Sequence, residues 1–500
     1  MNKKTKNIIR ICLCSLAVLF GVACTISARW YLSTFGDLGF DSILFTLMSD
    51  LSTTESTTVN DYLLKALLPI ILISGALSVL LFIDTKKPLI SIKSKNIKLY
   101  PLPKWLSTVL SLVIAVVLII NAAISTSFAD FIVNMTQKSN IYETEYVDPK
   151  NVEIEFPEQK RNVIIIYLES METSYFDKAN GGAKEENVIP ELYNLAKENT
   201  NFSHNDGVGG FSTLPGATFT TGALLSSTSG VPLKVKVAVG SNGYSTDENF
   251  LPGITTLTEI LNNEGYYQAF MVGSAAEFGG RKDYFETHGI DKIYDHSTAI
   301  QDGIIPKDYH VWWGMEDYYL FEYAKKELSE ISKTSEPFAF SMLTVDTHHI
   351  GGYICKNCKN DHAEQYDNAI SCSSRQVAEF VEWIKNQDFF QNTTLIVTGD
   401  HISMDGEYGS RNFSADYKRH IYNCFINSAV TTEKTKNSVF TATDLFPTIL
   451  ASMDCKIEGE RLGLGTNLFS ETPTLCEKLG IEKLKRELQK TSDYYNEKFY

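Results

Sequence analysis

The chain has little positive charge for its length. Its 500 residues include 45 lysines and arginines against 60 aspartates and glutamates, and the formal net charge is -15. Domains that bind nucleic acid usually present a basic surface, so this balance argues against a nucleic-acid partner. Internal repeats and low-complexity tracts are also lacking, which argues against a repeat architecture.

Long apolar runs are present, although the average composition conceals them. Three occur at about residues 8–28, 63–83 and 105–128, and each is close to the roughly 20 residues that a bilayer-spanning helix needs. The first is longer than the apolar core of a typical signal peptide, and two more follow it. We therefore interpret it as an anchor and predict a multi-pass membrane protein.

Charged residues near these runs predict the orientation. Lysines and arginines precede the first run and crowd the loop after the second, at Lys3, Lys4, Lys6, Arg10, Lys86, Lys87, Lys93, Lys95, Lys98 and Lys104. The segment between the first two runs is acidic, with residues 37, 41, 50, 55 and 61 being Asp or Glu. Since lysine and arginine collect on the cytoplasmic side, everything after about Phe128 is predicted to be extracytoplasmic.

Beyond residue 161 the pattern changes to alternating strands and helices. Strand-like runs occur at 162–168, 267–272, 339–345 and 395–398, and helix-like segments at 190–198, 257–264, 317–331 and 374–386. This alternation is typical of an α/β domain with a mainly parallel central sheet between helices. The predicted organisation is a membrane anchor at 1–128, a juxtamembrane linker at 129–161, the α/β domain at 162–476 and one amphipathic helix at 477–500.

The cysteines of this α/β part leave two possibilities open. Cys355, Cys358 and Cys372 are compatible with a zinc site that lacks one ligand or with a disulfide. An oxidising exterior favours the disulfide, and Cys455 with Cys476 is the second disulfide that we expect.

Two of the predicted strands end in residues that bind metal ions. Glu169 follows the strand at 162–168, and Gly399 leads from the strand at 395–398 into Asp400 and His401. Ligands of open α/β sheets bind beyond the carboxyl ends of the strands, so both tips are candidates for one metal site. The alternative is an ordinary polar turn in which Asp400 caps a helix.

Residues 216–232 contain candidates for a reactive hydroxyl group. This segment begins as a glycine-containing loop and continues as a helix of small residues that stops at Gly230 and Pro232. A threonine at the start of that helix has its hydroxyl among free N–H groups, where the helix dipole favours an alkoxide and a bound phosphate. A simple threonine N-cap is the alternative.

Five motifs occur in the order found in the lipoteichoic acid synthase and phosphoglycerol transferase family. They are residues 168–170, the threonine-rich loop that ends at residues 230–233, residues 278–281, residues 344–349 and residues 398–401. Over about residues 162–470 the chain resembles this family, which belongs to the alkaline phosphatase/sulfatase superfamily. The resemblance implies a sulfatase-like catalytic domain outside the cytoplasm.

The resemblance also implies roles for single residues. Glu169, Thr220, Asp400 and His401 would hold a divalent cation, with manganese favoured over magnesium or zinc. Thr220 would double as the nucleophile, because its distance from residues 230–233 matches the periplasmic-glucan phosphoglycerol transferases, although Thr218 and Thr221 stay open as alternatives.

Further residues would handle the phosphate. Arg281 has the planar donor fork that suits a phosphate oxygen, and His348 would bind the glycerol phosphate or protonate the departing oxygen. A role for the neighbouring His349 is left open. The run from Trp312 to Asp317 also resembles a family motif, in which Asp317 is interpreted as a helix cap.

The function implied is the transfer of glycerol phosphate from phosphatidylglycerol to a cell-envelope polymer, glycan or glycolipid, through a phosphothreonine-type intermediate. Two departures from the pattern of the lipoteichoic acid synthases favour the phosphoglycerol transferase branch and leave the acceptor open. The His, Asp and Trp that the synthases place before the arginine are absent, with Ser274 and Gly279 in the corresponding places, and there are three spans rather than five.

The sequence also leaves other functions open. A phosphoethanolamine transferase or a sulfatase-like hydrolase of phosphodiesters or sulfate esters is the enzymatic alternative, and an anchored binding protein is the non-enzymatic one. The motif Cys-x-Pro-x-Arg of true sulfatases is missing, since the nearest match, residues 372–375, has the wrong spacing and no proline.

Overall fold

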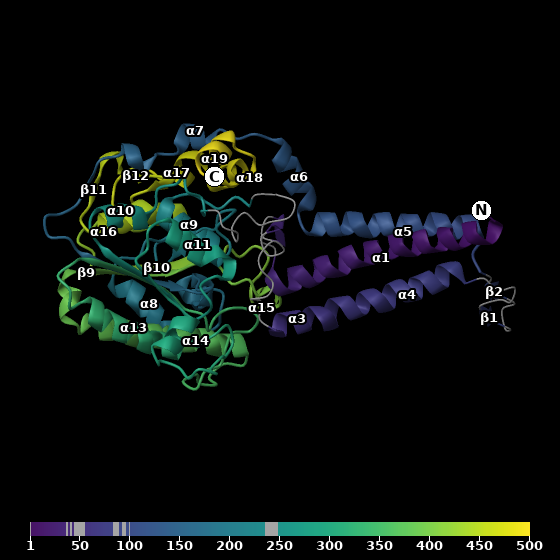
Figure 1. The fold of residues 1–500 in the computed structure, drawn as a ribbon, viewed down its shortest axis with the longest axis horizontal. Coiled ribbons are helices and arrows are strands. Elements are labelled where there is room, and N and C mark those ends of the chain that lie inside the picture. Colours follow the sequence, from purple (N-terminus) through teal and green to yellow (C-terminus); the bar gives the residue numbers. More distant parts are fainter. Residues whose placement is uncertain are drawn as a thin grey trace. The chain divides into compact units, whose positions relative to one another are not determined.

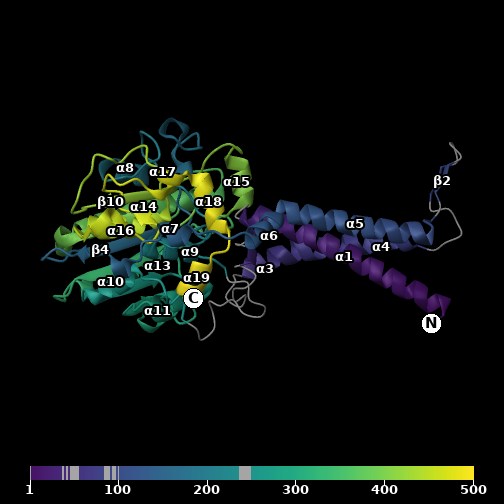
Figure 2. The same ribbon diagram turned by 90° about the horizontal axis from the view of Figure 1, so that it is seen from above.

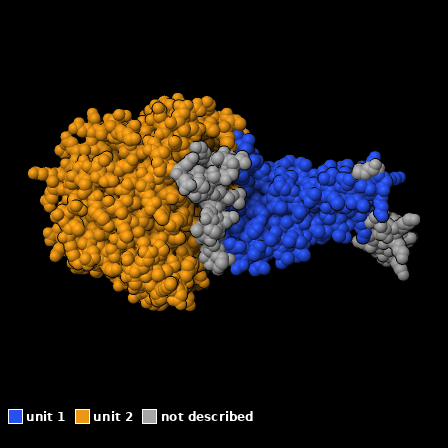
Figure 3. Space-filling view, in the orientation of Figure 1, with its two compact units in different colours: residues 1–40, 54–132 blue, residues 41–53, 133–500 orange. Residues whose placement is uncertain are grey.

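The structure, a computed structural model, describes residues 2–36, 39–40, 43–44, 56–83, 90–92, 97–99, 101–235 and 249–500. The chain divides into two compact units (Figure 3). One comprises residues 1–40 and 54–132, and the other comprises residues 41–53 and 133–500.

Long apolar helices make up the first unit. They are α1 (Lys3–Phe35), α4 (Leu68–Phe82), which continues from α3 (Ser56–Tyr62) through a π-helical turn (Leu63–Leu67), and α5 (Lys104–Ser125). Strands β1 (Ile90–Ile92) and β2 (Ile97–Leu99) pair antiparallel between α4 and α5. Three segments, 3–35, 58–82 and 104–125, are long and apolar enough to cross a membrane, as predicted. Much of the loop used to predict orientation, including Lys86, Lys87, Lys93 and Lys95, lies outside the described residues, as do residues 37, 41, 50 and 55.

Small residues bring the helices of this unit together. A Cβ atom added to Gly21 of α1 would lie 3.0 Å from the Cα atom of Ala115 in α5, so the two backbones are in close contact, as is common between membrane helices. The outward surface is apolar. Among the described residues, all strongly exposed large apolar side chains except Ile350, Ile354 and Val439 fall within residues 8–135. Such a concentrated apolar surface is suited to lipid rather than water.

A seven-stranded sheet forms the core of the second unit. The strand order is β5-β10-β9-β4-β8-β6-β7. The strands in that order are β5 (Gly210–Phe211), β10 (Ile421–Ile426), β9 (Thr393–Gly399), β4 (Asn162–Leu168), β8 (Phe338–Leu343), β6 (Tyr267–Val272) and β7 (Lys292–Tyr294). The five strands from β9 to β7 are parallel, and β10 is antiparallel to both of its neighbours. The predicted α/β fold with a mainly parallel sheet is therefore confirmed.

Helices cover both faces of this sheet (Figure 1). One face packs on α8 (Pro190–Glu198), α13 (Asp317–Ile331) and α14 (Gln365–Lys385), and the other on α9 (Thr220–Ser229), α10 (Leu257–Asn263) and α16 (Ala442–Ser452). Side chains alternate along β4 because successive Cβ atoms of a strand point to opposite faces. Ile164 and Ile166 join the core with Leu320 of α13, whereas the Tyr167 hydroxyl lies 3.0 Å from Ser227 Oγ of α9.

Shorter elements complete the chain. The helices are α6 (Phe128–Thr136), α7 (Ile141–Glu145), α11 (Arg281–Thr287), α12 (His296–Gln301), α15 (Gly406–Asn412), α17 (Leu475–Leu479), α18 (Ile481–Gln489) and α19 (Asp493–Lys498). Two small antiparallel pairs are β3 (Ile154–Glu155) with β11 (Lys456–Ile457) and β12 (Arg461–Leu462) with β13 (Gly465–Thr466). Since β3 pairs with β11, the predicted linker at 129–161 contributes a strand to the second unit.

Two predicted helices differ in the structure. Helix α14 begins at Gln365 rather than at Ser374, because Tyr366, Ala369 and Ile370 of its polar-looking first half are buried. The single helix predicted for 477–500 is instead three short helices, α17 to α19 (Figure 2). Gly480 has φ 83°, which ends α17, and Thr491 leaves the helical path to hydrogen-bond with Gln137 through both backbone and side chain.

The predicted disulfides are not formed, since all nine cysteines are free thiols. Cys455 directly precedes β11 and Cys476 lies in α17, each buried. Cys355 Sγ and Cys358 Sγ are 3.6 Å apart, well beyond the roughly 2.05 Å of an S–S bond.

Gly399 closes β9 in a space that admits no side chain. A Cβ atom there would lie 2.0 Å from the carbonyl oxygen of Met171. Gly399→Ala should therefore lower the free energy of unfolding by about 1–3 kcal/mol, as overpacking usually does. Thermal unfolding of the purified protein measures the change. Gly409→Ala in α15 is the matched control, because its Cβ would meet only Phe413 at 3.8 Å, and equal stability of the two variants would contradict the prediction.

Candidate active site

Three neighbouring parallel strands end at the same edge of the sheet. Strand pairing places Leu168 of β4 beside Gly399 of β9, and Tyr167 beside Leu343 of β8. The residues that follow, Glu169, Asp400 and Thr344, therefore emerge side by side at the carboxyl edge, where open α/β sheets bind their ligands.

Glu169, Asp400 and His401 form a compact buried cluster. One ligand atom from each lies within 4.8 Å of the others. His401 Nε2 is 3.3 Å from Asp400 Oδ2 and 3.6 Å from Glu169 Oε1. The structure thus brings together three of the four residues that the sequence predicted as metal ligands, from two different strand ends.

Thr220 completes this cluster. Its Oγ1 atom lies 3.3 Å from Glu169 Oε2 and 3.3 Å from His401 Nε2. The N-cap of α9 is Phe219, and Thr220 is the first helical residue, so the interpretation of Thr220 as a simple N-cap is wrong. Thr221 points elsewhere, because its hydroxyl donates to the carbonyl of Gly279 at 2.8 Å, and Thr218 is buried whereas Thr220 is partly exposed. Thr220 therefore has its hydroxyl against Glu169 and His401.

The hydrogen bonds of the cluster leave it short of positive charge. His401 Nδ1 lies 2.8 Å from the carbonyl of Ile402 and must donate there, so the lone pair of Nε2 faces the carboxylates. Asp400 Oδ1 accepts N–H groups from Ser170 and His401 at 2.9 and 2.7 Å. Asp400 Oδ2 is buried and has no hydrogen-bond partner. Oxygen and nitrogen lone pairs facing one another in this way suit a bound divalent cation.

The pKa shifts of Asp400 and His401 agree with this shortage of positive charge. Burial raises the pKa of Asp400 to about 7, so its anionic form needs a compensating charge. Burial lowers the pKa of His401, but the nearby carboxylates of Asp400 and Glu169 outweigh it and raise that pKa overall. A proton on His401 and a metal ion therefore compete for the same cluster.

Neighbouring hydroxyls orient Glu169, although the sequence reasoning assigned them no role. Ser170 Oγ donates to Glu169 Oε1 at 2.6 Å, Thr347 Oγ1 donates to the Glu169 carbonyl at 2.6 Å, and Thr344 Oγ1 accepts the Glu169 N–H at 3.0 Å. Ser170 has φ 55°, which turns the chain sharply after Glu169. Ser170 and Thr347 are adjacent to the predicted site residues Glu169 and His348, and Thr344 begins the motif that contains His348. Membership of these motifs was the signal that could have identified them.

Arg281 offers a buried cation beside the cluster. Its Nη2 group donates to Ser274 Oγ at 2.9 Å and to the carbonyl of Ala275 at 2.8 Å. The buried Nε–H has no hydrogen-bond partner. Burial lowers the pKa of Arg281 to about 10, although Glu169 and Asp400 oppose this, so the guanidinium stays charged at neutral pH. Ser274 thus holds the arginine in place and leaves a donor for an anionic oxygen.

His348 lies on the loop that follows β8. Its Nδ1 is 2.7 Å from the carbonyl of His349, and its ring centroid is 4.6 Å from that of Trp313. Burial lowers the pKa of His348, so the ring is neutral at pH 7 and its Nε2 is an acceptor. His349 stacks on His348 with ring centroids 4.3 Å apart, and burial puts the pKa of His349 well below its usual value.

Asp317 anchors this loop instead of capping a helix. The N-cap of α13 is Glu316, so the interpretation of Asp317 as a cap is wrong. Its carboxylate accepts the N–H groups of Val345 and Asp346 at 2.7 and 3.2 Å, and its own N–H donates to Asp346 Oδ1 at 3.1 Å. The two carboxylates lie side by side and are both buried.

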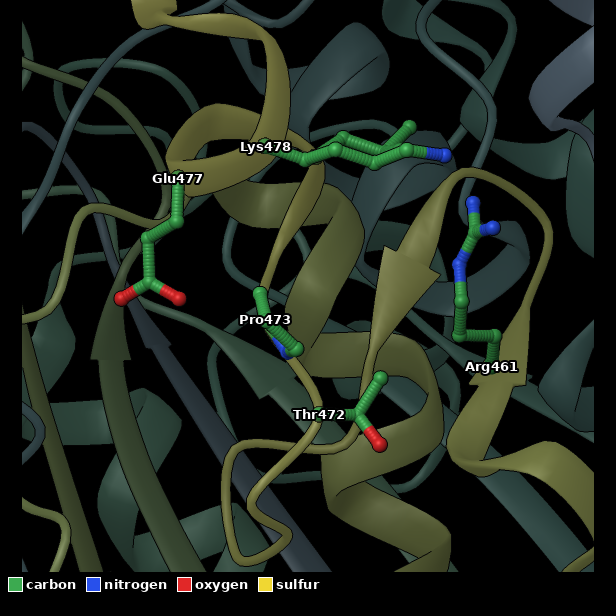
Figure 4. Close-up of a pocket in the computed structure, with 6 residues that line it drawn as sticks. Arg461, Thr472, Pro473, Glu477 and Lys478 are labelled. Carbon is green, nitrogen blue, oxygen red and sulfur yellow. The ribbon is translucent and has the colours of Figure 1, made fainter.

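A hollow in the same unit contains none of the predicted site residues. It is lined by Arg461, Thr472, Pro473, Leu475, Glu477 and Lys478 (Figure 4). Arg461 and Lys478 both approach the carboxylate of Glu145, at 3.7 and 2.8 Å. The two basic side chains of the hollow therefore already share one carboxylate of the protein.

The profile of the sulfatase family matches residues 161–455. Because the match covers more than half of the chain, this protein belongs to the sulfatase family. The predicted membership of this superfamily is confirmed.

Two relatives of this chain are phosphoglycerol transferases. Phosphoglycerol transferase I of Escherichia coli (strain 55989 / EAEC) is 31% identical over 258 residues, which is 50% of this chain and 32% of that protein. Phosphoglycerol transferase I of Citrobacter koseri is 31% identical over 255 residues. The chain thus spans about a third of the length of the curated relatives it matches.

Solved structures share the fold. The integral membrane lipooligosaccharide phosphoethanolamine transferase A of Neisseria meningitidis aligns with a TM-score of 0.51 and 13% identity, over 88% of this chain and 84% of that chain. The lipoteichoic acid synthase LtaP of Listeria monocytogenes aligns with a TM-score of 0.49 and 19% identity, over 64% and 79%. The predicted fold class, apolar N-terminal helices followed by a sulfatase-like α/β domain, is confirmed.

The pair of Asp317 and Asp346 should make stability depend on pH. Burial and the neighbouring Asp317 charge put the pKa of Asp346 well above its usual value, whereas the unfolded chain releases this proton near pH 4, at about 3.9. As pH rises above that value the unfolded state binds fewer protons than the folded state, so stability falls. Asp346→Asn has no proton to lose.

The free energy of unfolding of Asp346→Asn should therefore increase relative to that of the wild type as pH rises. Thermal unfolding of both proteins between pH 5 and 8, at about one-unit steps, measures this difference. Groups that titrate equally in both proteins cancel when the two are compared at the same pH. A difference that does not change with pH would contradict the raised pKa.

Proposed function

We propose that this protein is a membrane-anchored, metal-dependent phosphoglycerol transferase. It would move glycerol phosphate from phosphatidylglycerol to a glycan, a glycolipid or a glycerol-phosphate polymer of the cell envelope. The observation that carries this proposal is the Thr220 hydroxyl, held 3.3 Å from both Glu169 and His401 in a chain that is 31% identical to phosphoglycerol transferase I.

The proposed metal ligands are Glu169, Thr220, Asp400 and His401. Carboxylate, hydroxyl and one imidazole suit manganese, and magnesium or zinc also fits such a set. A divalent cation bound there would offset the negative charge of a phosphodiester and make the Thr220 hydroxyl more acidic. Asp400 Oδ2 is buried and accepts no hydrogen bond, and this observation supports a cation at this place.

The proposed reaction has two steps. In the first, Thr220 Oγ1 bonds to the phosphorus of the lipid head group and the bond from phosphorus to the diacylglycerol oxygen breaks. The proton of Thr220 replaces that bond on the departing oxygen, and the free Nε2 of His348 is suited to relay it. In the second, the oxygen of an acceptor hydroxyl bonds to phosphorus and the bond from phosphorus to Thr220 Oγ1 breaks. The proton lost by the acceptor hydroxyl returns to Thr220 Oγ1.

Arg281 would bind the transferred group through both steps. Its guanidinium is charged, is held by Ser274, and has one buried N–H without a partner. A donor fixed in this way stabilises the added negative charge of the transition state without having to reorganise. A lysine could not reproduce this planar arrangement.

A formylglycine-dependent sulfatase is not supported by the positions of the cysteines. Cys372, the nearest match to such a precursor, lies inside α14, whereas the hydroxyl beside the candidate metal ligands belongs to Thr220 at the start of α9. A phosphoethanolamine transferase has the same type of fold, so labelled head groups must separate the two transferases.

The proposed location is the outer side of the cell membrane. The basic residues in the first turns of α1 and in the loop after α4 favour a cytoplasmic position for both, and three spans would then carry the second unit across. The lipid donor and the envelope acceptor are both accessible there.

Incubation of the purified full-length protein with phosphatidylglycerol and Mn²⁺ should give a glycerophosphoryl adduct on the peptide that contains Thr220. Thr220→Ala should abolish the adduct and lower diacylglycerol release at least about 1,000-fold, because the nucleophile is lost. Mass spectrometry and lipid analysis measure the two effects. Thr221→Ala is the matched control, and phosphatidylethanolamine is the competing donor.

Undiminished diacylglycerol release by Thr220→Ala would contradict the assignment of the nucleophile. An adduct formed from phosphatidylethanolamine in preference would contradict the proposed donor and favour a phosphoethanolamine transferase.

Asp400→Asn should weaken Mn²⁺ binding by more than about 100-fold, since the variant loses the buried anionic oxygen that accepts no hydrogen bond. Electron paramagnetic resonance of free Mn²⁺ during a titration measures the affinity without any activity assay. Asp444→Asn is the control, because Asp444 is also buried but completes the capping box of α16 by accepting the N–H of the N-cap Thr441, and asparagine keeps an oxygen for this hydrogen bond. Equal loss of affinity in both variants would contradict the proposed site.

A further inference from the structure

A second cluster of possible metal ligands lies outside the candidate active site. Cys355 and Cys358 lie on the loop between His349 and α14, and Cys372 lies in the second turn of α14. Cys355 Sγ is 3.6 Å from Cys358 Sγ and 3.8 Å from Cys372 Sγ, and the three sulfur atoms all lie within 4.8 Å of one another.

The sulfur spacing distinguishes a metal site from a disulfide. An S–S bond needs about 2.05 Å. Thiolates bound tetrahedrally at about 2.3 Å from a zinc ion lie about 3.8 Å apart, by the geometry of a tetrahedron. The separations of 3.6 and 3.8 Å agree with the second arrangement.

The surroundings of the sulfur atoms also suit thiolates. Gln376, one turn after Cys372 on α14, directs its side-chain Nε2 to Cys372 Sγ at 3.7 Å and to Cys355 Sγ at 4.0 Å. N–H groups that point at ligating sulfur atoms stabilise the negative charge of the bound thiolates. Cys355 and Cys372 are buried and Cys358 is half-buried, so solvent reaches the cluster from the side of Cys358.

We propose that Cys355, Cys358 and Cys372 bind one zinc ion, with a water molecule as the fourth ligand. The three thiols lose their protons to solvent on binding. Thiolate sulfur prefers zinc over the magnesium or manganese that suits an oxygen-rich site, so this ion is distinct from the one proposed at Glu169, Asp400 and His401. The proposal does not depend on the transferase activity.

The zinc ion would tie the loop that carries the histidines to a core helix. Tyr353, two residues before Cys355, donates its N–H to the carbonyl of Asp346 at 2.7 Å, and its ring lies 6.3 Å from that of Trp312. The Gly351 N–H donates to Asp405 Oδ2 at 3.0 Å. The loop has little regular structure of its own, so these hydrogen bonds and the zinc ion would hold it on α14.

Cobalt replacement tests the proposal in the full-length protein, purified in detergent under inert gas. Only thiolate ligands give a sulfur-to-cobalt charge-transfer band, and the site at Glu169, Asp400 and His401 contains no sulfur. The band should appear in the wild type and persist in Asp400→Asn. It should be lost in Cys358→Ser and Cys372→Ser and persist in Cys424→Ser, whose thiol is buried elsewhere and donates to the Leu195 carbonyl.

A second measurement needs no variant. A thiol-blocking mercurial added to the zinc-loaded wild type should release one zinc ion for each chain, as detected with a colorimetric chelator. Absence of the charge-transfer band in the wild type would overturn the proposal, and so would a disulfide among the three cysteines in protein purified without an oxidant. Neither result would bear on the glycerophosphoryl adduct at Thr220, so the two proposals fail separately.

Discussion

The parallel register of β9, β4 and β8 is the constraint on which the rest of the site depends. It brings Glu169 and Asp400, two buried carboxylates, to adjacent positions at one sheet edge. Two such charges repel each other and lose their hydration, so the fold tolerates them only with compensating positive charge. The imidazole of His401, the guanidinium of Arg281 and a divalent cation are the groups that can provide it. In the proposed reaction, the cation that compensates the two carboxylates would also make the Thr220 hydroxyl more acidic.

Residues that follow β4 and β8 hold the cluster in place. Hydroxyls of Ser170, Thr344 and Thr347 bind both ends of Glu169, and Asp317 binds the backbone that precedes His348. Groups that are held before the substrate arrives need not reorganise during reaction. The start of α9 then presents Thr220 to this preformed cluster, while its neighbour Thr221 is occupied by Gly279.

The two proposed metal sites differ in donor chemistry and in burial. Oxygen and imidazole donors lie at the sheet edge, whereas the three sulfur donors join an irregular loop to α14. The first set lies against the Thr220 hydroxyl, whereas the second would restrain the loop by joining it to a core helix. Restraint is useful here because the same loop follows His348 and His349 directly.

Much of the fold and of the cluster was predictable from local sequence. Buried parallel strands read as continuous apolar runs, so β4 and β6 were placed with the bounds that they have, and the acidic and imidazole residues at the strand ends followed. Apolar length likewise determined the three helices of the first unit. The strand order, the role of Asp317, the division of the C-terminal segment into α17 to α19 and the early start of α14 were not predictable, because each depends on a partner distant in sequence. The tertiary structure also decided which threonine faces Glu169 and His401, since three candidates within four residues differ only in where a helix begins against the sheet. It likewise decided that Cys355, Cys358 and Cys372 lie at the spacing of metal ligands, because spacing along a chain does not set the distance between sulfur atoms on a loop and on a helix.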